Sequence, residues 1–320
     1  MKAQSPLPPM GSGAVYLTEG GTETEIMYRH GFELPEFSML PLLDKPQAVA
    51  AISGVLSQQL DVAAEFGFSF LLTGLDYRAS PDWGAKLGYS PSGLAEANIA
   101  AIELLRDIAK GYRRQIPNLL IGGILGPRGD AYSLNKEITV DSAEDYHAIQ
   151  LETLKKADVD FVSALTFNNI AEAVGAARAA AKLGLSLSVS LTLDSTCRLK
   201  SGPTLSDAIT EIDARTGEDA PDYYMISCSH PLEYEPALEG GDWIKRLRGV
   251  RPNASKMDKL ALCKLGHIED GDPVELGAQL RSLSDRYPHM DVFGGCCGTG
   301  HAHLREIAKA LGGRQPALSV

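Results

Sequence analysis

Short apolar segments alternate with longer segments of helical period along most of the chain. This alternation is typical of βαβ units, whose strands form a parallel sheet. The seventh of the segments that predict strands is the weakest, because three arginines interrupt it. The predicted strands span residues 14–20, 68–74, 119–126, 159–167, 185–194, 223–228, 246–253 and 290–297.

The clearest amphipathic segment spans residues 94–116, where Leu94, Ile99, Ile102, Leu105 and Ile108 recur mostly at steps of three and four. Segments 20–57 and 194–221 lack clear periodicity and predict loops and short helices above the sheet. Further helices are predicted at 144–157, 170–184, 275–287 and 303–313.

The order of the elements predicts an α/β fold, a (β/α)8 or TIM barrel. Such barrels reach about 250 residues and more as single domains. We therefore expect one domain over 14–320, with loop insertions at the carboxyl ends of the strands. The preceding residues 1–13, which contain three prolines and no apolar stretch, predict a flexible leader rather than a signal peptide.

The composition is that of an ordinary folded protein, with 44% hydrophobic and 22% charged residues among 320. The formal net charge of −11 argues against nucleic acid and anionic membranes as partners, because both require a basic surface. No run approaches the roughly 18 apolar residues that a membrane span requires. The sequence thus predicts small-molecule substrates and leaves a homo-oligomer open.

Five cysteines, an odd number without a secretion signal, favour a reducing compartment and hence the cytoplasm. Cys228 ends the sixth predicted strand, and Cys296 and Cys297 end the eighth. Catalytic groups of α/β barrels lie at the carboxyl ends of the strands, so these three thiols should converge on one mouth of the barrel. Cys197 and Cys263 lack such surroundings, and we interpret both as structural.

Two readings of the cysteine pair remain open from the residues alone. A free cysteine is usually a small buried hydrophobic side chain, but flanking glycines allow the chain to turn and bring adjacent thiols to one metal. A local Cys2His2 cluster with His301 and His303 is a further alternative. The segment around these histidines is also typical of a loop that enters a helix.

Several motifs occur at the ends of the predicted strands and in the helices between them. They are TEGGTETE, TGLDYRAS, GGILGPRGD, EAVGAA, ISCSHP, RPNAS and GGCCGTGHAH. With these motifs, residues 16–312 resemble the homocysteine S-methyltransferase family. This family includes the betaine- and S-methylmethionine-dependent enzymes and the homocysteine domain of methionine synthase. The GGCC motif, together with the distant cysteine of ISCSHP, is the most specific part of the resemblance.

The resemblance implies a TIM barrel in which Cys228, Cys296 and Cys297 hold Zn²⁺ and a fourth position receives the acceptor thiol. It implies methyl transfer from a sulfonium or ammonium donor to homocysteine, which gives methionine. Thiol chemistry agrees, since only a few per cent of a thiol with a pKa of about 8.5 is ionised at neutral pH, and zinc ligation ionises it. A cationic donor would suit an aromatic wall, for which Tyr77 and Trp83 are candidates.

The predicted substrate-binding residues are Glu19, Tyr77, Thr166 and Asn253, and Glu19 is also the predicted catalytic residue. The family usually has Asp where this chain has Glu19, and Glu where it has Leu165. The family's two carboxylates hold the amino group of homocysteine, and an apolar side chain cannot do so. A different thiol or selenol acceptor is therefore an alternative. A zinc lyase or hydrolase is less favoured, because three thiolates make zinc a poor Lewis acid.

Overall fold

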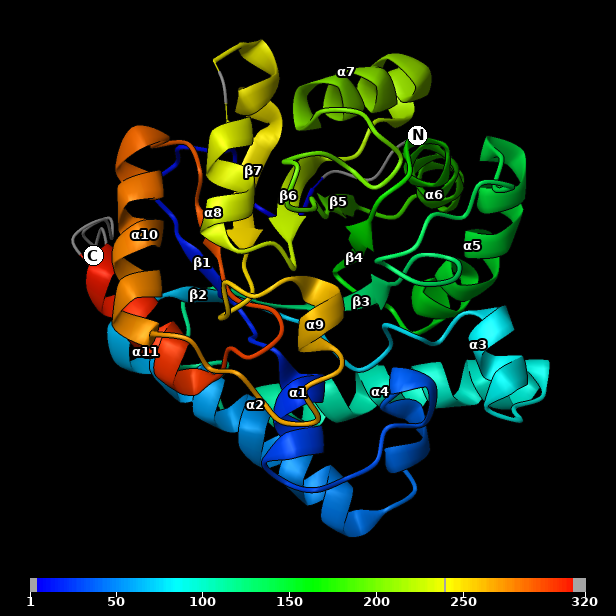
Figure 1. The fold of residues 1–320 in the computed structure, drawn as a ribbon. Helices are drawn as coiled ribbons and strands as arrows, with labels where there is room; N and C mark the ends of the chain where they lie inside the picture. Colours follow the sequence, from blue (N-terminus) through cyan, green and yellow to red (C-terminus); the bar gives the residue numbers. More distant parts are fainter. Residues whose placement is uncertain (1–4, 239, 313–320) are drawn as a thin grey trace.

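The computed structural model describes residues 5–238 and 240–312. The strands are all parallel and form a closed barrel in the order of the sequence (Figure 1). The predicted single-domain (β/α)8 fold is thereby confirmed. The strands are β1 (Tyr16–Thr18), β2 (Ser69–Leu72), β3 (Leu119–Leu125), β4 (Phe161–Phe167), β5 (Leu187–Leu191), β6 (Tyr223–Ser227), β7 (Leu247–Arg251) and β8 (Val292–Phe293).

Helices surround the barrel, and short helices lie near the ends of the strands, with α9 across the barrel mouth (Figure 1). Their apolar faces and the outward side chains of the strands form the main core. None of the described helices is long and apolar enough to span a lipid bilayer. The α-helices are α1 (Thr22–Tyr28), α2 (Pro46–Phe66), α3 (Pro81–Lys86), α4 (Pro91–Lys110), α5 (Val140–Lys156), α6 (Ile170–Leu183), α7 (Leu205–Thr216), α8 (Pro231–Tyr234), α9 (Lys259–Leu262), α10 (Pro273–Arg286) and α11 (His301–Leu311).

The helices expected from amphipathic periodicity are present as α4, α5, α6, α10 and α11. The expectation of only loops and short helices in 20–57 and 194–221 was wrong, because α2 begins in the first segment and α7 lies in the second. In α2, the buried Gln59 interrupts the apolar stripe and its side chain accepts a hydrogen bond from Gly20 N at 2.9 Å. In α7, Thr204 and Asp207 form a capping box, a helix-start signal independent of periodicity.

The arginines that weakened the prediction of β7 each have a carboxylate partner. Arg248 is buried and binds Asp291 at 2.6 Å, and Arg251 is buried beside Glu19 at 3.0 Å. A strand can therefore place these arginines inside the barrel, because ion pairing offsets much of the desolvation cost. The apolar pattern of β7 is weak in the sequence because it contains arginines whose charges are paired only in the folded protein.

Large side chains fill the amino end of the barrel interior. Leu7 is only 5% exposed and belongs to this layer, although it lies in the segment for which the sequence predicts a leader. Pro8 O also accepts a hydrogen bond from Arg248 at 2.8 Å. Residues 5–13 thus contact the amino end of the barrel, while 1–4 lie outside the described residues. The layer contains Leu7, Tyr16, Leu71, Phe161, Tyr223, Met225 and Val292.

Replacing Arg248 by Met should destabilise the protein by about 3 kcal/mol, because Asp291 would remain buried without its counter-ion. Urea unfolding followed by circular dichroism would measure the loss. The matched control is Lys245→Met, which breaks an exposed pair with Asp242 and should cause no measurable change. Equal midpoints for the two variants would show that the Arg248 pair contributes no more than a surface pair.

Candidate metal centre

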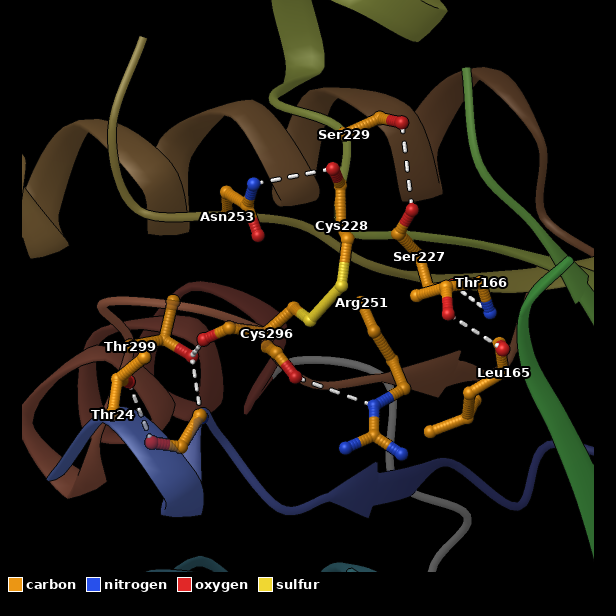
Figure 2. Close-up of a disulfide and its surroundings, with 12 residues drawn as sticks. Thr24, Leu165, Thr166, Ser227, Cys228, Ser229, Arg251, Asn253, Cys296 and Thr299 are labelled. Carbon is orange, nitrogen blue, oxygen red and sulfur yellow. Dashed lines mark hydrogen bonds between the residues drawn. A yellow bond between two sulfur atoms is a disulfide. The ribbon is translucent and has the colours of Figure 1, made fainter. Parts of the chain in front are cut away.

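Three cysteine sulfurs meet at the carboxyl end of the barrel, as the sequence predicts. Cys228 follows β6, and Cys296 and Cys297 follow β8; their Sγ atoms all lie within 4.8 Å of one another. In this structure Cys228 and Cys296 are joined by a disulfide and Cys297 is a free thiol (Figure 2). Among the described residues, this is the group of cysteine, histidine or carboxylate side chains that could hold a metal ion.

Residues at the end of β7 hold Cys228 on one side and Cys296 on the other. Cys228 has a φ of 52°, in the left-handed region, so the chain turns sharply as it leaves β6. Its N–H donates to Arg251 O at 3.0 Å, and the Asn253 amide donates to Cys228 O at 3.1 Å. Cys296 N donates to Pro252 O at 2.8 Å. The β7 end therefore connects the turns that carry the thiols.

Glycines allow the loop after β8 to wind tightly. Gly298 has a φ of 80°, and a Cβ there would lie 2.3 Å from Glu269 O. A Cβ on Gly295 would lie 2.0 Å from the Thr299 hydroxyl. Both distances are far below van der Waals contact, so only glycine fits. The loop can thus direct two adjacent cysteines to one place.

A cavity of about 280 Å³ opens beside the three sulfurs. Its volume is close to the lower end of the range for small-ligand sites. All the residues predicted to bind substrate, namely Glu19, Tyr77, Thr166 and Asn253, line it. Leu165 lines it as well, which places this apolar side chain where a substrate would contact it.

The Glu19 carboxylate is engaged by protein groups on several sides. It is 1% exposed and faces Arg251 Nη2 at 3.0 Å. Thr73 donates to it from its backbone N at 3.2 Å and also from its hydroxyl. A carboxylate with this many partners is fixed in place, and its charge is largely neutralised before any ligand arrives.

Only one of the two expected aromatic candidates reaches the cavity. The Tyr77 phenol exchanges a hydrogen bond with the Thr166 hydroxyl at 2.5 Å, and burial raises its pKa well above the usual value. Trp83 instead lies outside the cavity between two cations, with Arg78 and Lys86 about 4 Å from its ring centre. From the sequence, Trp83 could either line the donor site or only pack its loop, and the structure has it packed in the loop. The remaining aromatic lining comes from Tyr28, Phe37 and Tyr132.

The alternative Cys2His2 cluster is not formed. His303 Nδ1 accepts a hydrogen bond from Gly300 N at 3.2 Å, and Nε2 contacts Asp270 O at 2.7 Å. Both ring nitrogens are therefore used at the start of α11. His301 is exposed on the same helix.

Sequence reasoning missed several residues of the cavity. Glu23 lies in the first turn of α1, and burial raises its pKa to about 7. Burial, followed by the charge of Glu23, also raises the pKa of the Cys297 thiol to about 12. Cys263, expected to be structural, lines the cavity as well. The other missed residues are Arg251, Tyr132 and Lys259. The one available signal was that Glu23 lies only four residues after Glu19, at the carboxyl end of the first strand.

The family model described as homocysteine S-methyltransferase matches residues 16–311. The chain belongs to the homocysteine S-methyltransferase family. As a member of that family it is a methyltransferase, and the resemblance inferred from the cysteine motifs is confirmed. Because the match spans nearly the whole barrel, the cluster and the cavity both lie inside the matched region.

Solved structures of the homocysteine methyltransferase MmuM from Escherichia coli share this fold. The oxidised form has 21% identity and a TM-score of 0.72, and the metallated form has 20% identity and a TM-score of 0.69. The alignments cover 93% of this chain and 96% of MmuM. The apo form also matches, with 20% identity and a TM-score of 0.64. At this identity the similarity establishes the common barrel.

Mild oxidation should leave three of the five cysteines free for alkylation after denaturation, because Cys228 and Cys296 pair. Reduction should restore five. Mass spectrometry of the alkylated peptides would identify the pair. In the control variant Cys228→Ser, the number of free thiols should be the same with and without reductant. In the wild type, a disulfide that includes Cys197 would contradict the pairing of Cys228 with Cys296.

Proposed function

We propose that this family member is a zinc-dependent S-methyltransferase that transfers a methyl group from a sulfonium or ammonium donor to the thiolate of homocysteine, giving methionine. The observation that supports it most is the meeting of Cys228, Cys296 and Cys297 beside one cavity. A small-molecule thiol and a small methyl donor fit such a cavity. We place the activity in the cytoplasm, where thiols remain reduced.

The chemistry of the donor set suits zinc. Three protein ligands with one open position are typical of catalytic zinc, and soft thiolates select zinc over harder cations. Zinc–sulfur bonds of about 2.3 Å in a tetrahedron place the sulfurs about 3.8 Å apart, compatible with sulfurs that all lie within 4.8 Å. The disulfide must be reduced before Cys228 and Cys296 can serve as ligands. Metallated and oxidised forms of MmuM are both known, and we propose the same two states here.

Zinc, when bound, would supply the positive charge that ionises the acceptor thiol. The protein contributes the surroundings. Tyr77 and Tyr132 line the same cavity as Cys297. Aromatic faces attract sulfonium and quaternary ammonium groups, so this wall is suited to a cationic methyl donor.

The reduced protein should bind about one zinc per chain and form methionine from homocysteine and a labelled methyl donor. Cys296→Ala should abolish metal binding and turnover, because two remaining thiols cannot complete the ligand set. Metal analysis and product chromatography would measure both. S-methylmethionine and glycine betaine represent the sulfonium and ammonium classes of donor.

Cys197→Ala is the matched control, because Cys197 is a free thiol away from the cavity. It should retain both zinc and activity. Stoichiometric zinc in the Cys296→Ala protein would contradict the ligand assignment. Zinc binding by the wild type without methyl transfer to any thiol, from either class of donor, would contradict the proposed reaction.

A further inference from the structure

The charges around the cavity are unevenly paired. Among the cationic side chains that line it, Arg251 faces Glu19, Arg78 faces Asp130 at 3.7 Å, and Lys259 faces Glu233 at 3.2 Å. Two lining carboxylates, Glu23 and Glu269, have no ion pair with any described residue. The cavity therefore has an excess of negative charge when both are ionised.

Glu23 is the unpaired carboxylate beside the thiols. It lies in the first turn of α1 and lines the same cavity as Cys297, and two residues before it a Cβ on Gly21 would lie 2.4 Å from Cys296 O. No side chain of another described residue donates a hydrogen bond to it. The side chain is partly buried and lines the cavity, so a ligand that enters can reach the carboxylate. A cationic ligand would supply the missing counter-charge.

Arg251 lines the same cavity and retains hydrogen-bonding capacity. Its Nε donates to Gly295 O at 3.2 Å, and its Nη2 contacts Glu19 O at 3.3 Å and the Glu19 carboxylate at 3.0 Å (Figure 2 shows the Arg251 side chain). Nη1 has no partner among the described residues. A guanidinium group with a spare N–H is well suited to a ligand carboxylate.

Building on the proposed function, we propose that Glu23 and Arg251 bind the two charged groups of an α-amino acid acceptor. Glu23 accepts hydrogen bonds from the ammonium group, and Arg251 Nη1 donates to the carboxylate. Leu165, which lines the cavity without a charge, contributes an apolar contact instead. The acceptor is thus a zwitterionic thiol such as homocysteine, with its ammonium group recognised from α1.

Hydrogen-bond chemistry assigns Glu23 to the acceptor rather than to the methyl-bearing group of the donor. A primary ammonium has N–H donors for a carboxylate, whereas a sulfonium or trimethylammonium centre has none. The position beside Cys297 also fits, because the ammonium of a short amino-acid thiol lies only a few bonds from its sulfur. A carboxylate next to the cysteines is therefore within reach of that group.

The test compares homocysteine with 4-sulfanylbutanoate, the same thiol without its amino group, at a saturating donor concentration. In Glu23→Gln the ratio of the two kcat/KM values, homocysteine over 4-sulfanylbutanoate, should fall about ten- to a hundredfold, as expected for a lost charge-assisted hydrogen bond. The value for 4-sulfanylbutanoate should change little. Glu269→Gln, the other unpaired carboxylate of the cavity, is the matched control and should leave the ratio unchanged.

A binding measurement separates this proposal from the reaction itself. Calorimetry with the reduced protein should show tighter binding of methionine than of 4-(methylsulfanyl)butanoate, and Glu23→Gln should abolish that preference. Glu23→Asp should restore part of it, and circular dichroism would verify that the variants fold. This measurement requires no methyl donor, so it remains decisive if no methyl transfer is found.

Three outcomes would overturn the role of Glu23. One is a wild type without preference for methionine over its des-amino analogue. Another is an unchanged preference in Glu23→Gln. The third is a Glu23→Gln effect confined to the KM of the methyl donor, which would assign the carboxylate to that substrate. Absence of methyl transfer by the wild type to every thiol, with the binding preference intact, would contradict only the proposed reaction.

Discussion

The site depends on the pairing of β1 with β8, which closes the barrel. Tyr16 and Leu17 pair with Val292 and Phe293, so the first and last strands lie side by side. Beyond them the two loops continue in contact, and a Cβ on Gly21 would lie 2.4 Å from Cys296 O. Residues separated by nearly the whole sequence therefore form one wall. Glu23 and the cysteine pair face the same cavity because the barrel closes in this register.

Glu19 and Arg251, which both line the cavity, form a buried ion pair. A carboxylate that is 1% exposed is costly unless it is paired, and Arg251 together with Thr73 satisfies it. Glu19 holds the arginine, which also contacts Gly295 in the loop before Cys296. Glu23, four residues later in α1, has no ion pair among the described residues. Our proposal therefore gives Glu19 a role in the architecture of the site and Glu23 a role in substrate binding.

The alternation of apolar segments was sufficient to predict the barrel, because most strands and helices follow local patterns of apolar residues, with β7 the weakest of the strands. The cysteine centre was also predictable, since it needs only the positions of Cys228, Cys296 and Cys297 relative to strand ends. The role of Arg251 was not predictable, because an arginine in a strand acquires a partner only through packing. Glu23 and Cys263 were missed for a related reason: the direction of a short helix or loop at a barrel mouth depends on tertiary contacts.

The filled amino end of the barrel has a consequence for access to the cysteines. Leu7, Tyr16 and Leu71 occupy that end, so the cavity beside the cysteines opens at the carboxyl face. The three sulfurs are therefore reached from the carboxyl face, through the cavity beside them. In the reaction proposed above, both substrates would use this one entrance, and whichever group reacts at the sulfurs would have to pass through the cavity to reach them.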